Sequence, residues 1–131
     1  FTYGDGVADV NIKELVDYHK KNNVSATLTA VEPIGRFGRI TIDGDYVKNF
    51  EEKPAGDQGW INGGFFVLEP KVIDLIKDDN TIWEREPLEA LAKNGELAAY
   101  KHTGFWEAMD TMRDKILLNK LCKEGNALWE K

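Results

Sequence analysis

The chain has 131 residues, of which 42% are hydrophobic and 31% are charged, and its formal net charge is -6 at pH 7. This length and hydrophobic fraction suit one soluble globular unit with a buried core. The acidic balance argues against a nonspecific nucleic-acid binder, because neutralising phosphates requires a basic surface, and no apolar run approaches the roughly 20 residues that cross a bilayer. We therefore expect a cytoplasmic protein that binds neither nucleic acid nor membranes.

The N-terminal region is predicted to form a strand, a helix and a second strand. The opening FTYGDG begins with strand-forming residues and ends in a tight turn that carries Asp5. Apolar residues recur at helical spacing over 11–23, where Asn11 can act as the N-cap and Glu14 can complete a capping box. The segment 25–32 is rich in β-branched residues. This order suggests a βαβ crossover in a largely parallel sheet.

The middle of the chain is predicted to be a β-hairpin followed by a buried strand. Two alternating segments, 39–42 and 46–50, flank the turn sequence Asp43-Gly44-Asp45. Asp-Gly between alternating runs is a strong hairpin signal. The next strand lies within 60–70, and its run over 65–68 is expected to be fully buried because all four residues are apolar.

The C-terminal third is predicted to contain mainly helices. In chain order these elements are helices over 70–77 and 82–95, a strand over 96–102 and a helix over 111–125. Thr111 and Asp114 have the spacing of a capping box for the last helix. Cys122 is expected to be a packed thiol in that helix, since the chain has no second cysteine for a disulfide.

These elements indicate an α/β protein with an incomplete, Rossmann-like mixed sheet. It would consist of one βαβ unit, a β-hairpin insertion and C-terminal helices. A doubly wound sheet usually has several parallel strands, and the first strand here has no visible predecessor. We therefore interpret residues 1–131 as a single unit that forms the C-terminal part of a larger domain.

Four motifs occur in an order that resembles the sugar-nucleotide pyrophosphorylases, a family of nucleotidyltransferases. They are YGDG at 3–6, FEEKP at 50–54, INGGFFVL at 61–68 and GFWEAMDT at 104–111. The residues of these motifs are most similar to those of family members that use CTP and glucose 1-phosphate. The similarity runs from residue 1 to about residue 129. The family's N-terminal signature, a glycine-rich loop with GTR and PKP elements, is not found in this sequence. The resemblance thus implies a nucleotidyltransferase domain that lacks its N-terminal nucleotide-binding half.

The resemblance also implies a metal site. The reaction is an in-line attack of the sugar phosphate on the α-phosphorus of CTP, which forms CDP-glucose and releases pyrophosphate with the help of a divalent ion. Asp5 and Asp110 lie in the family's metal-binding motif and are the predicted catalytic ligands of Mg²⁺, which prefers hard oxygen donors. Two alternatives stay open from the residues alone. Asp5 could be a turn residue in the left-handed region or bonded to nearby backbone, and Asp110 could be the N-cap of the last helix.

The predicted sugar pocket contains five residues. In the family, the lysine at the position of Lys53 contacts the sugar phosphate and the acid at the position of Glu52 bonds sugar hydroxyls. Gly38 would let the ligand approach the backbone, and Asn62 with Gly63 would offer polar groups and space. The alternatives are a solvated lysine at a strand end, a strand bulge at Gly38 and a turn at Asn62-Gly63.

Two function classes remain compatible with the sequence. The first is the sugar-phosphate and metal part of a nucleotidyltransferase, which would have negligible activity without its nucleotide-binding half. The second is a non-catalytic sugar- or phosphate-binding module, or a structural fragment. No chemistry is assigned to His19 or His102, and Trp106 is expected to be a core residue more than a stacking platform. A homo-oligomer is a further expectation, because a truncated sheet invites pairing with another chain.

Overall fold

The structure is a computed structural model that describes residues 1–33, 39–43, 45–51 and 59–130. Its central sheet consists of β2 (Ala26–Val31), β5 (Ile61–Leu68) and β6 (Leu97–His102), in the order β5-β2-β6. β2 pairs antiparallel with β5 and parallel with β6. The sheet is therefore mixed, and the prediction of an α/β fold with an incomplete mixed sheet is confirmed.

The strands of the predicted crossover have other neighbours in the structure than we expected. Thr2 forms an antiparallel bridge with Phe65 of β5, so the first segment runs parallel to β2 but is separated from it by β5. The parallel neighbour of β2 is β6, a pairing that was not predicted. The expectation of a largely parallel sheet is thus wrong, because β5 occupies the position between the two strands of the crossover.

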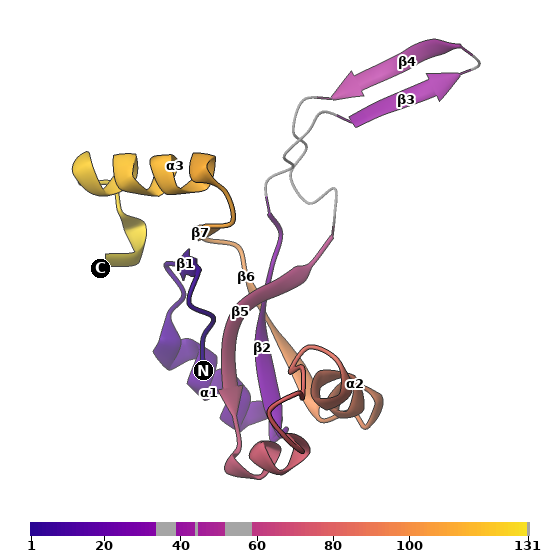
Figure 1. Cartoon of the computed structure of the whole chain (residues 1–131), viewed down its shortest axis with the longest axis vertical. Coiled ribbons are helices and arrows are strands. Elements are labelled where there is room, and N and C mark those ends of the chain that lie inside the picture. Colours follow the sequence, from indigo (N-terminus) through magenta and orange to yellow (C-terminus); the bar gives the residue numbers. More distant parts are fainter. Residues whose placement is uncertain (34–38, 44, 52–58, 131) are drawn as a thin grey trace.

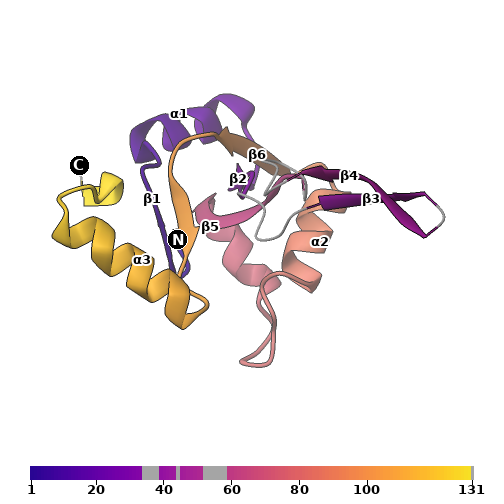
Figure 2. The ribbon, with the colours of Figure 1, turned by 90° about the horizontal axis from the view of Figure 1, so that it is seen from above.

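Helices cover both faces of this sheet (Figures 1 and 2). Helix α1 (Ile12–Asn22) lies on one face, and the 3₁₀ helix η1 (Pro70–Leu75) and helix α2 (Glu86–Lys93) lie on the other. A core cluster lies on the second face and comprises Ala26, Phe66, Val72, Leu88 and Leu91. Burial of each large apolar side chain contributes about 1.5–3 kcal/mol. The sheet is therefore held between two helical layers.

The run over 65–68 is less buried than predicted. Phe66 is 4% exposed and packs in the core cluster, whereas Phe65, Val67 and Leu68 are half-buried. Phe65 and Val67 alternate with Phe66 and lie on the opposite face of β5, beside the half-buried Val16 of α1. The expectation that all four residues are fully buried is therefore wrong.

The helix ends agree with the local capping signals. The Asn11 side chain accepts a 3.2 Å hydrogen bond from the amide of Glu14, and Asn23 ends α1 with φ of 51°. Over 70–77 the helix is a short 3₁₀ turn, and the helix predicted over 82–95 begins only at Glu86. Within the described ranges, no helix is long and apolar enough to span a membrane.

A two-stranded ribbon and a helix lie beside the sheet (Figure 1). The ribbon pairs β1 (Gly6–Ala8) antiparallel with β7 (Trp106–Ala108). The chain then continues into α3 (Met112–Lys123) and the 3₁₀ turn η2 (Leu128–Glu130). Cys122 is exposed on α3, so the expectation of a packed thiol is wrong. This side of α3 faces solvent, and the Cys122 sulfur lies 3.9 Å from a Glu130 carboxylate oxygen.

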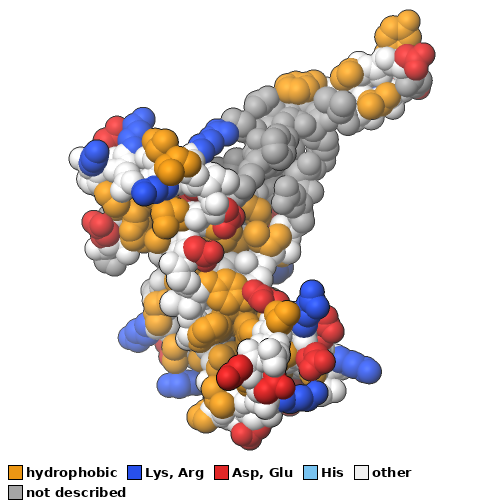
Figure 3. Space-filling view, in the orientation of Figure 1, with side chains coloured by type: hydrophobic (Ala, Val, Ile, Leu, Met, Phe, Trp, Pro, Cys, Tyr) orange, Lys and Arg blue, Asp and Glu red, His pale blue; other side chains and the backbone are white. Residues whose placement is uncertain are grey.

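The predicted hairpin is confirmed. It pairs β3 (Arg39–Asp43) with β4 (Tyr46–Glu51), with Asp43 opposite Tyr46 next to the turn. The hairpin extends away from the sheet (Figure 1), and orange side chains are visible along it in Figure 3. Its large exposed side chains are Ile42, Tyr46, Val47 and Phe50. An isolated two-stranded hairpin of this kind is marginally stable in water.

Candidate active site

The β1–β7 ribbon brings the two predicted metal ligands onto adjoining segments. Gly6 lies opposite Ala108 in the ladder, and the amide of Met109 donates a 2.8 Å hydrogen bond to the carbonyl oxygen of Asp5. Asp110 is the next residue along the chain, and both aspartates are exposed. Two residues separated by most of the sequence are therefore held at the same end of one short ribbon.

The backbone of Asp110 is fixed by the start of α3. One carboxylate oxygen of Asp114 accepts hydrogen bonds from the amides of Asp110, at 3.2 Å, and Thr111, at 2.8 Å. In return the Thr111 hydroxyl accepts from the amide of Asp114 at 3.3 Å, which completes the predicted capping box. The alternative that Asp110 is the N-cap is wrong, because Thr111 has that role. The Asp110 side chain is therefore not required for capping.

The backbone conformation of Asp5 excludes one form of the turn alternative. Among the described residues, the one non-glycine residue with a left-handed backbone is Asn23. Asp5 therefore lies in a bend that any residue type can adopt. A left-handed conformation, the first form of the turn alternative, does not explain why an aspartate is found between Gly4 and Gly6.

Asn62 is joined to the segment that leads into Asp5. Its side-chain nitrogen donates a 3.1 Å hydrogen bond to the Tyr3 hydroxyl, and its side-chain oxygen accepts a 2.9 Å hydrogen bond from the amide of Gly64. Burial raises the pKa of Tyr3 to about 12, and a hydrogen bond to the Glu84 carboxylate acts in the same direction. Tyr3 therefore remains a neutral phenol at ordinary pH and holds Asn62 near the Asp5 segment.

Gly63 is in close contact with protein atoms. A Cβ at this position would lie 2.9 Å from Val31 Cγ1 and 3.1 Å from the carbonyl oxygen of Thr29. The Gly63 carbonyl also accepts a 2.8 Å hydrogen bond from the indole nitrogen of Trp106. Gly63 thus lets β5 approach β2 and β7 closely, and this packing role is independent of any sugar.

Trp106 connects the ribbon to the sheet through that hydrogen bond. It belongs to β7, which leads to Asp110, and its partner Gly63 follows Asn62 on β5. The predicted metal ligands and the described part of the predicted sugar pocket therefore lie on elements that bond directly to one another. The structural role expected for Trp106 agrees with this contact.

The other predicted pocket residues, Gly38, Glu52 and Lys53, lie outside the described residues. The assignment of Gly38, Glu52 and Lys53 to the sugar pocket remains a prediction.

The donor set is compatible with a Mg²⁺ ion that is bound largely by substrate. Across the described ranges, no group of three or more His, Cys, Asp or Glu side chains is arranged to hold a metal. Asp5 and Asp110 offer two exposed carboxylates on adjoining segments. Mg²⁺ in phosphoryl-transfer sites is typically bound by one or two carboxylates, with phosphate and water oxygens completing its coordination.

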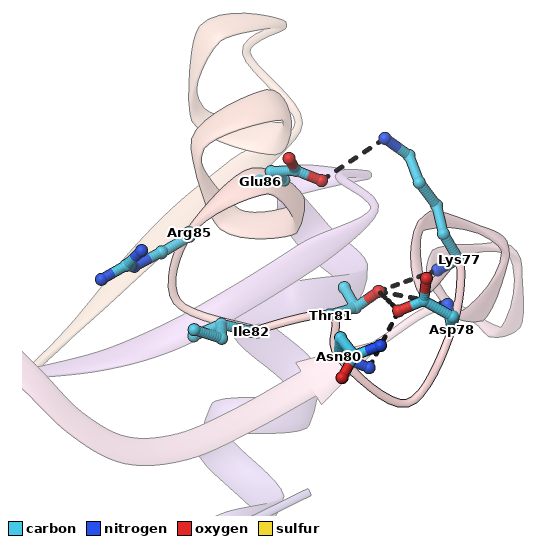
Figure 4. Close-up of a pocket in the computed structure, with 7 residues that line it drawn as sticks. All are labelled: Lys77, Asp78, Asn80, Thr81, Ile82, Arg85 and Glu86. Atoms are coloured by element: carbon cyan, nitrogen blue, oxygen red, sulfur yellow. Dashed lines mark hydrogen bonds and ion pairs between the residues drawn. The ribbon is translucent and has the colours of Figure 1, made fainter.

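A separate polar pocket of about 380 Å³ lies between η1 and α2 (Figure 4). Thr81 closes a turn there by accepting hydrogen bonds from the amides of Lys77 and Asp78. Lys77 forms a 3.4 Å ion pair with Glu86, and both side chains are 74% exposed. Of the described site residues, neither aspartate nor Asn62 nor Gly63 lines this pocket, so it is separate from the described part of the candidate active site.

Three residues of this site were not identified from the sequence as parts of it. Tyr3 was interpreted as a strand former, yet it orients Asn62. Asp114 was predicted as a capping residue, yet it also binds the amide of Asp110. Glu84 was not assigned to the site, yet its carboxylate contributes to the raised pKa of Tyr3. The spacing of Thr111 and Asp114 was the one local signal that pointed towards such a role.

Known proteins are similar to this chain over almost its whole length. A glucose-1-phosphate cytidylyltransferase of Salmonella typhi is 57% identical over 130 residues, which cover 99% of this chain and 51% of that protein. A Bacillus subtilis (strain 168) protein named "Probable glucose-1-phosphate cytidylyltransferase" is 47% identical over 98% of this chain and 51% of its own length. The chain thus spans about half the length of these curated relatives.

The fold has counterparts among solved structures. HddC from Yersinia pseudotuberculosis superposes with a TM-score of 0.61 at 24% identity, over 93% of this chain and 52% of HddC. The family model described as "Nucleotidyl transferase" matches residues 1–114. These residues include β1, β7 and both predicted metal ligands. The chain belongs to the nucleotidyl transferase family.

Proposed function

We propose that this chain is the sugar-phosphate and metal part of an enzyme that makes CDP-glucose from CTP and glucose 1-phosphate. The observation that carries the proposal is the β1–β7 ribbon, which holds Asp5 and Asp110 on adjoining segments. The 57% identity to a protein named glucose-1-phosphate cytidylyltransferase supports the choice of CTP and glucose 1-phosphate.

In the proposed reaction, a phosphate oxygen of glucose 1-phosphate attacks the α-phosphorus of CTP. A new P–O bond forms, and the bond between the α-phosphorus and the pyrophosphate oxygen breaks. Asp5 and Asp110 would hold Mg²⁺, which supplies positive charge to the phosphate oxygens. Lys53 would bind the sugar phosphate as a compact cation. Glu52 would orient the hexose by accepting hydrogen bonds from its hydroxyl groups.

Asn62 would lie beneath the sugar, and the buried Gly63 would support it by letting β5 pack closely behind. Asn62 uses one N–H on Tyr3 and one lone pair on Gly64, so its amide retains a second N–H and a second lone pair for a ligand. Tyr3 and Gly64 also restrict the rotation of this amide. A preorganised amide loses little entropy on binding, and it discriminates between hydroxyl positions of a hexose.

The remaining part of the enzyme would supply the nucleotide site. The chain matches about half of its curated relatives, and its sequence lacks a glycine-rich phosphate-binding loop. Backbone N–H groups of such a loop are a common means of binding a triphosphate. We therefore propose that the triphosphate site belongs to the part of the parent protein that this chain does not cover, and we expect negligible transferase activity from the 131-residue chain alone.

The test compares the full-length parent protein with the 131-residue chain. Each would be incubated with CTP, Mg²⁺ and glucose 1-phosphate, and CDP-glucose and pyrophosphate would both be quantified. UTP and dTTP in place of CTP test the base, and mannose 1-phosphate tests the hexose. The proposal predicts equimolar products from the parent with CTP and none from the short chain. A parent that binds glucose 1-phosphate without forming either product would instead be a non-catalytic binding module.

Cytoplasmic location and homo-oligomer formation remain predictions. The exposed apolar side chains of the hairpin, such as Ile42 and Phe50, are compatible with a contact to another part of the parent or to a second copy. Sedimentation of the full-length protein would distinguish a monomer from an oligomer.

A further inference from the structure

Asp9 and His102 form a contact at the end of the β1–β7 ribbon that is remote from Asp5. The Nε2 atom of His102 lies 3.0 Å from Oδ1 of Asp9 and 3.1 Å from the carbonyl oxygen of Phe105. The amide of Asp9 donates a 3.1 Å hydrogen bond to that same carbonyl. The His102 side chain is 10% exposed and the Asp9 side chain is 34% exposed. The His102 side of the contact is thus shielded from solvent, whereas Asp9 is exposed.

The partners of His102 determine its protonation at Nε2. A carbonyl oxygen and a carboxylate oxygen both accept hydrogen bonds, so Nε2 must carry a proton to bond either of them. The Phe105 carbonyl accepts from His102 and from the amide of Asp9, which uses both of its lone pairs. The carbonyl of Phe105 thus joins the side chain of His102 to the backbone of Asp9, and the Asp9 carboxylate lies 3.0 Å from the same Nε2 atom.

The backbone at Gly104 is crowded by the same two side chains. A Cβ at Gly104 would overlap the Asp9 carboxylate and the His102 ring. The chain between β6 and β7 therefore packs directly on the Asp9–His102 contact. This packing fixes where β7 begins relative to the end of β1.

The ribbon is short, so contacts at its ends contribute to its register as well as its own ladder. Each strand has three residues, with Ala8 opposite Trp106 and Gly6 opposite Ala108. Two-stranded ribbons are marginally stable, and a slip of one residue turns every side chain to the opposite face. The bond between Asp9 and Phe105 lies at one end of the ladder, and the bond between Asp5 and Met109 lies at the other.

We propose that Asp9 and His102 are a positioning pair that sets the register of the ribbon and thereby the placement of Asp110 beside Asp5. The Asp9–His102 pair itself is not proposed to contact substrate. It acts through the ladder, because any slip of β7 moves Asp110 along the chain direction and turns its side chain away. The importance for catalysis rests on the proposed function, whereas the register effect does not.

The variants separate loss of the Asp9–His102 contact from other effects of substitution. In the full-length protein, Asp9→Ala removes the acceptor, Asp9→Asn keeps an acceptor oxygen, and His102→Phe removes the donor while retaining a ring. Glu86→Ala is the control, because it removes a remote exposed ion pair with Lys77. If Asp9→Ala does not fold, His102→Phe carries the test.

Amide hydrogen exchange of Met109 reports the register without requiring activity. Asp9→Ala and His102→Phe are each expected to speed exchange of this amide by about tenfold or more. Exchange within β2 should not change, and Asp9→Asn and Glu86→Ala should behave as the wild type. Unchanged Met109 exchange in Asp9→Ala and His102→Phe would overturn the proposal, whatever the activity of the protein.

Steady-state kinetics then test the link to catalysis. For a parent that makes CDP-glucose, Asp9→Ala should lower kcat by about tenfold and leave KM for glucose 1-phosphate within about twofold. Asp9→Asn should restore kcat. If Met109 exchanges faster but kcat is unchanged, the pair affects only the register of the ribbon. That outcome would overturn its proposed positioning role in catalysis. A wild-type parent without activity would instead contradict the proposed function and leave the exchange result valid.

Discussion

The amide of Met109 donates a 2.8 Å hydrogen bond to the carbonyl oxygen of Asp5. This single backbone contact joins the turn near the start of the chain to the residue that precedes Asp110. The Asp114 carboxylate then fixes the amide of Asp110 from the other side. The placement of the two predicted metal ligands therefore depends on one short ladder and one helix cap.

Lys53→Ala in the full-length protein is expected to weaken the use of glucose 1-phosphate. The change removes a proposed charged contact to the sugar phosphate, so KM for glucose 1-phosphate should rise by about 10- to 100-fold. KM for CTP should change much less. Lys48→Ala is the matched control, because this lysine is exposed on the hairpin and pairs with Asp43. An unchanged KM for glucose 1-phosphate would contradict the role of Lys53.

Gly63→Ala is expected to destabilise the protein. The new methyl group would lie 2.9 Å from Val31 Cγ1 and 3.1 Å from the Thr29 carbonyl oxygen, and overpacking of this kind costs about 1–3 kcal/mol. Thermal unfolding would measure the loss as a lower Tm. Gly4→Ala is the control, since nothing lies within 4 Å of a Cβ at that position. Equal Tm values for the two variants would show that the crowding at Gly63 is relieved without cost.

Local elements of the fold were predictable because their signals lie within a few residues. Asn11 and Thr111 were predicted as helix caps, and both accept the expected backbone hydrogen bonds. The Asp43-Gly44-Asp45 sequence predicted the hairpin. Capping and turn formation depend on side chains that bond their own neighbours.

Non-local features were not predictable from residue patterns. The parallel pairing of β2 with β6 joins segments far apart in sequence, and no local pattern signals it. Exposure of Cys122 depends on which side of α3 the rest of the chain covers. That the Asp5 segment lies next to the Asp110 segment was expected because of the family resemblance, and the β1–β7 ladder is the contact that joins them.

Thr111→Ala is expected to lower stability by about 1 kcal/mol, because it removes the N-cap hydroxyl of α3. Thr111→Ser keeps a hydroxyl and should retain most of that stability. Urea denaturation of the full-length protein would compare the two variants. If Thr111→Ser and Thr111→Ala lower the free energy of unfolding equally, the loss comes from the threonine methyl group and not from the N-cap hydroxyl.

Stability is expected to fall at alkaline pH because of Tyr3. Burial raises its pKa from 10.0 to about 12, with a further contribution from the hydrogen bond to Glu84. Between these two pH values the folded state binds more protons than the unfolded state, so the free energy of unfolding falls as pH rises. The stabilisation is complete below pH 10.0 and is lost as pH approaches the folded pKa of about 12.

Tyr3→Phe removes this ionisation and should give a shallower fall in stability over the same range. Tyr46→Phe is the control, because Tyr46 is 80% exposed on the hairpin. Denaturation curves for the wild type and both variants at several alkaline pH values would measure the difference. Identical slopes for the wild type and Tyr3→Phe would show that Tyr3 does not cause the decline.

Two single substitutions in the full-length protein test each proposed metal ligand. Asp5→Asn and Asp110→Asn should each lower kcat by about 100-fold or more, because each removes a carboxylate from Mg²⁺. Both side chains are exposed, and the amide of Thr111 bonds Asp114 in either case. Tm should therefore change little. Normal turnover in either variant would remove that residue from the proposed site.

The double-mutant cycle tests most directly whether Asp5 and Asp110 hold one ion. It compares kcat for CDP-glucose formation in the wild type, Asp5→Asn, Asp110→Asn and the double variant. Ligands of a shared ion act as a unit, so the double variant should be about as slow as the slower single variant. Losses that multiply in the double variant would show that the two aspartates act independently and would contradict a shared metal site.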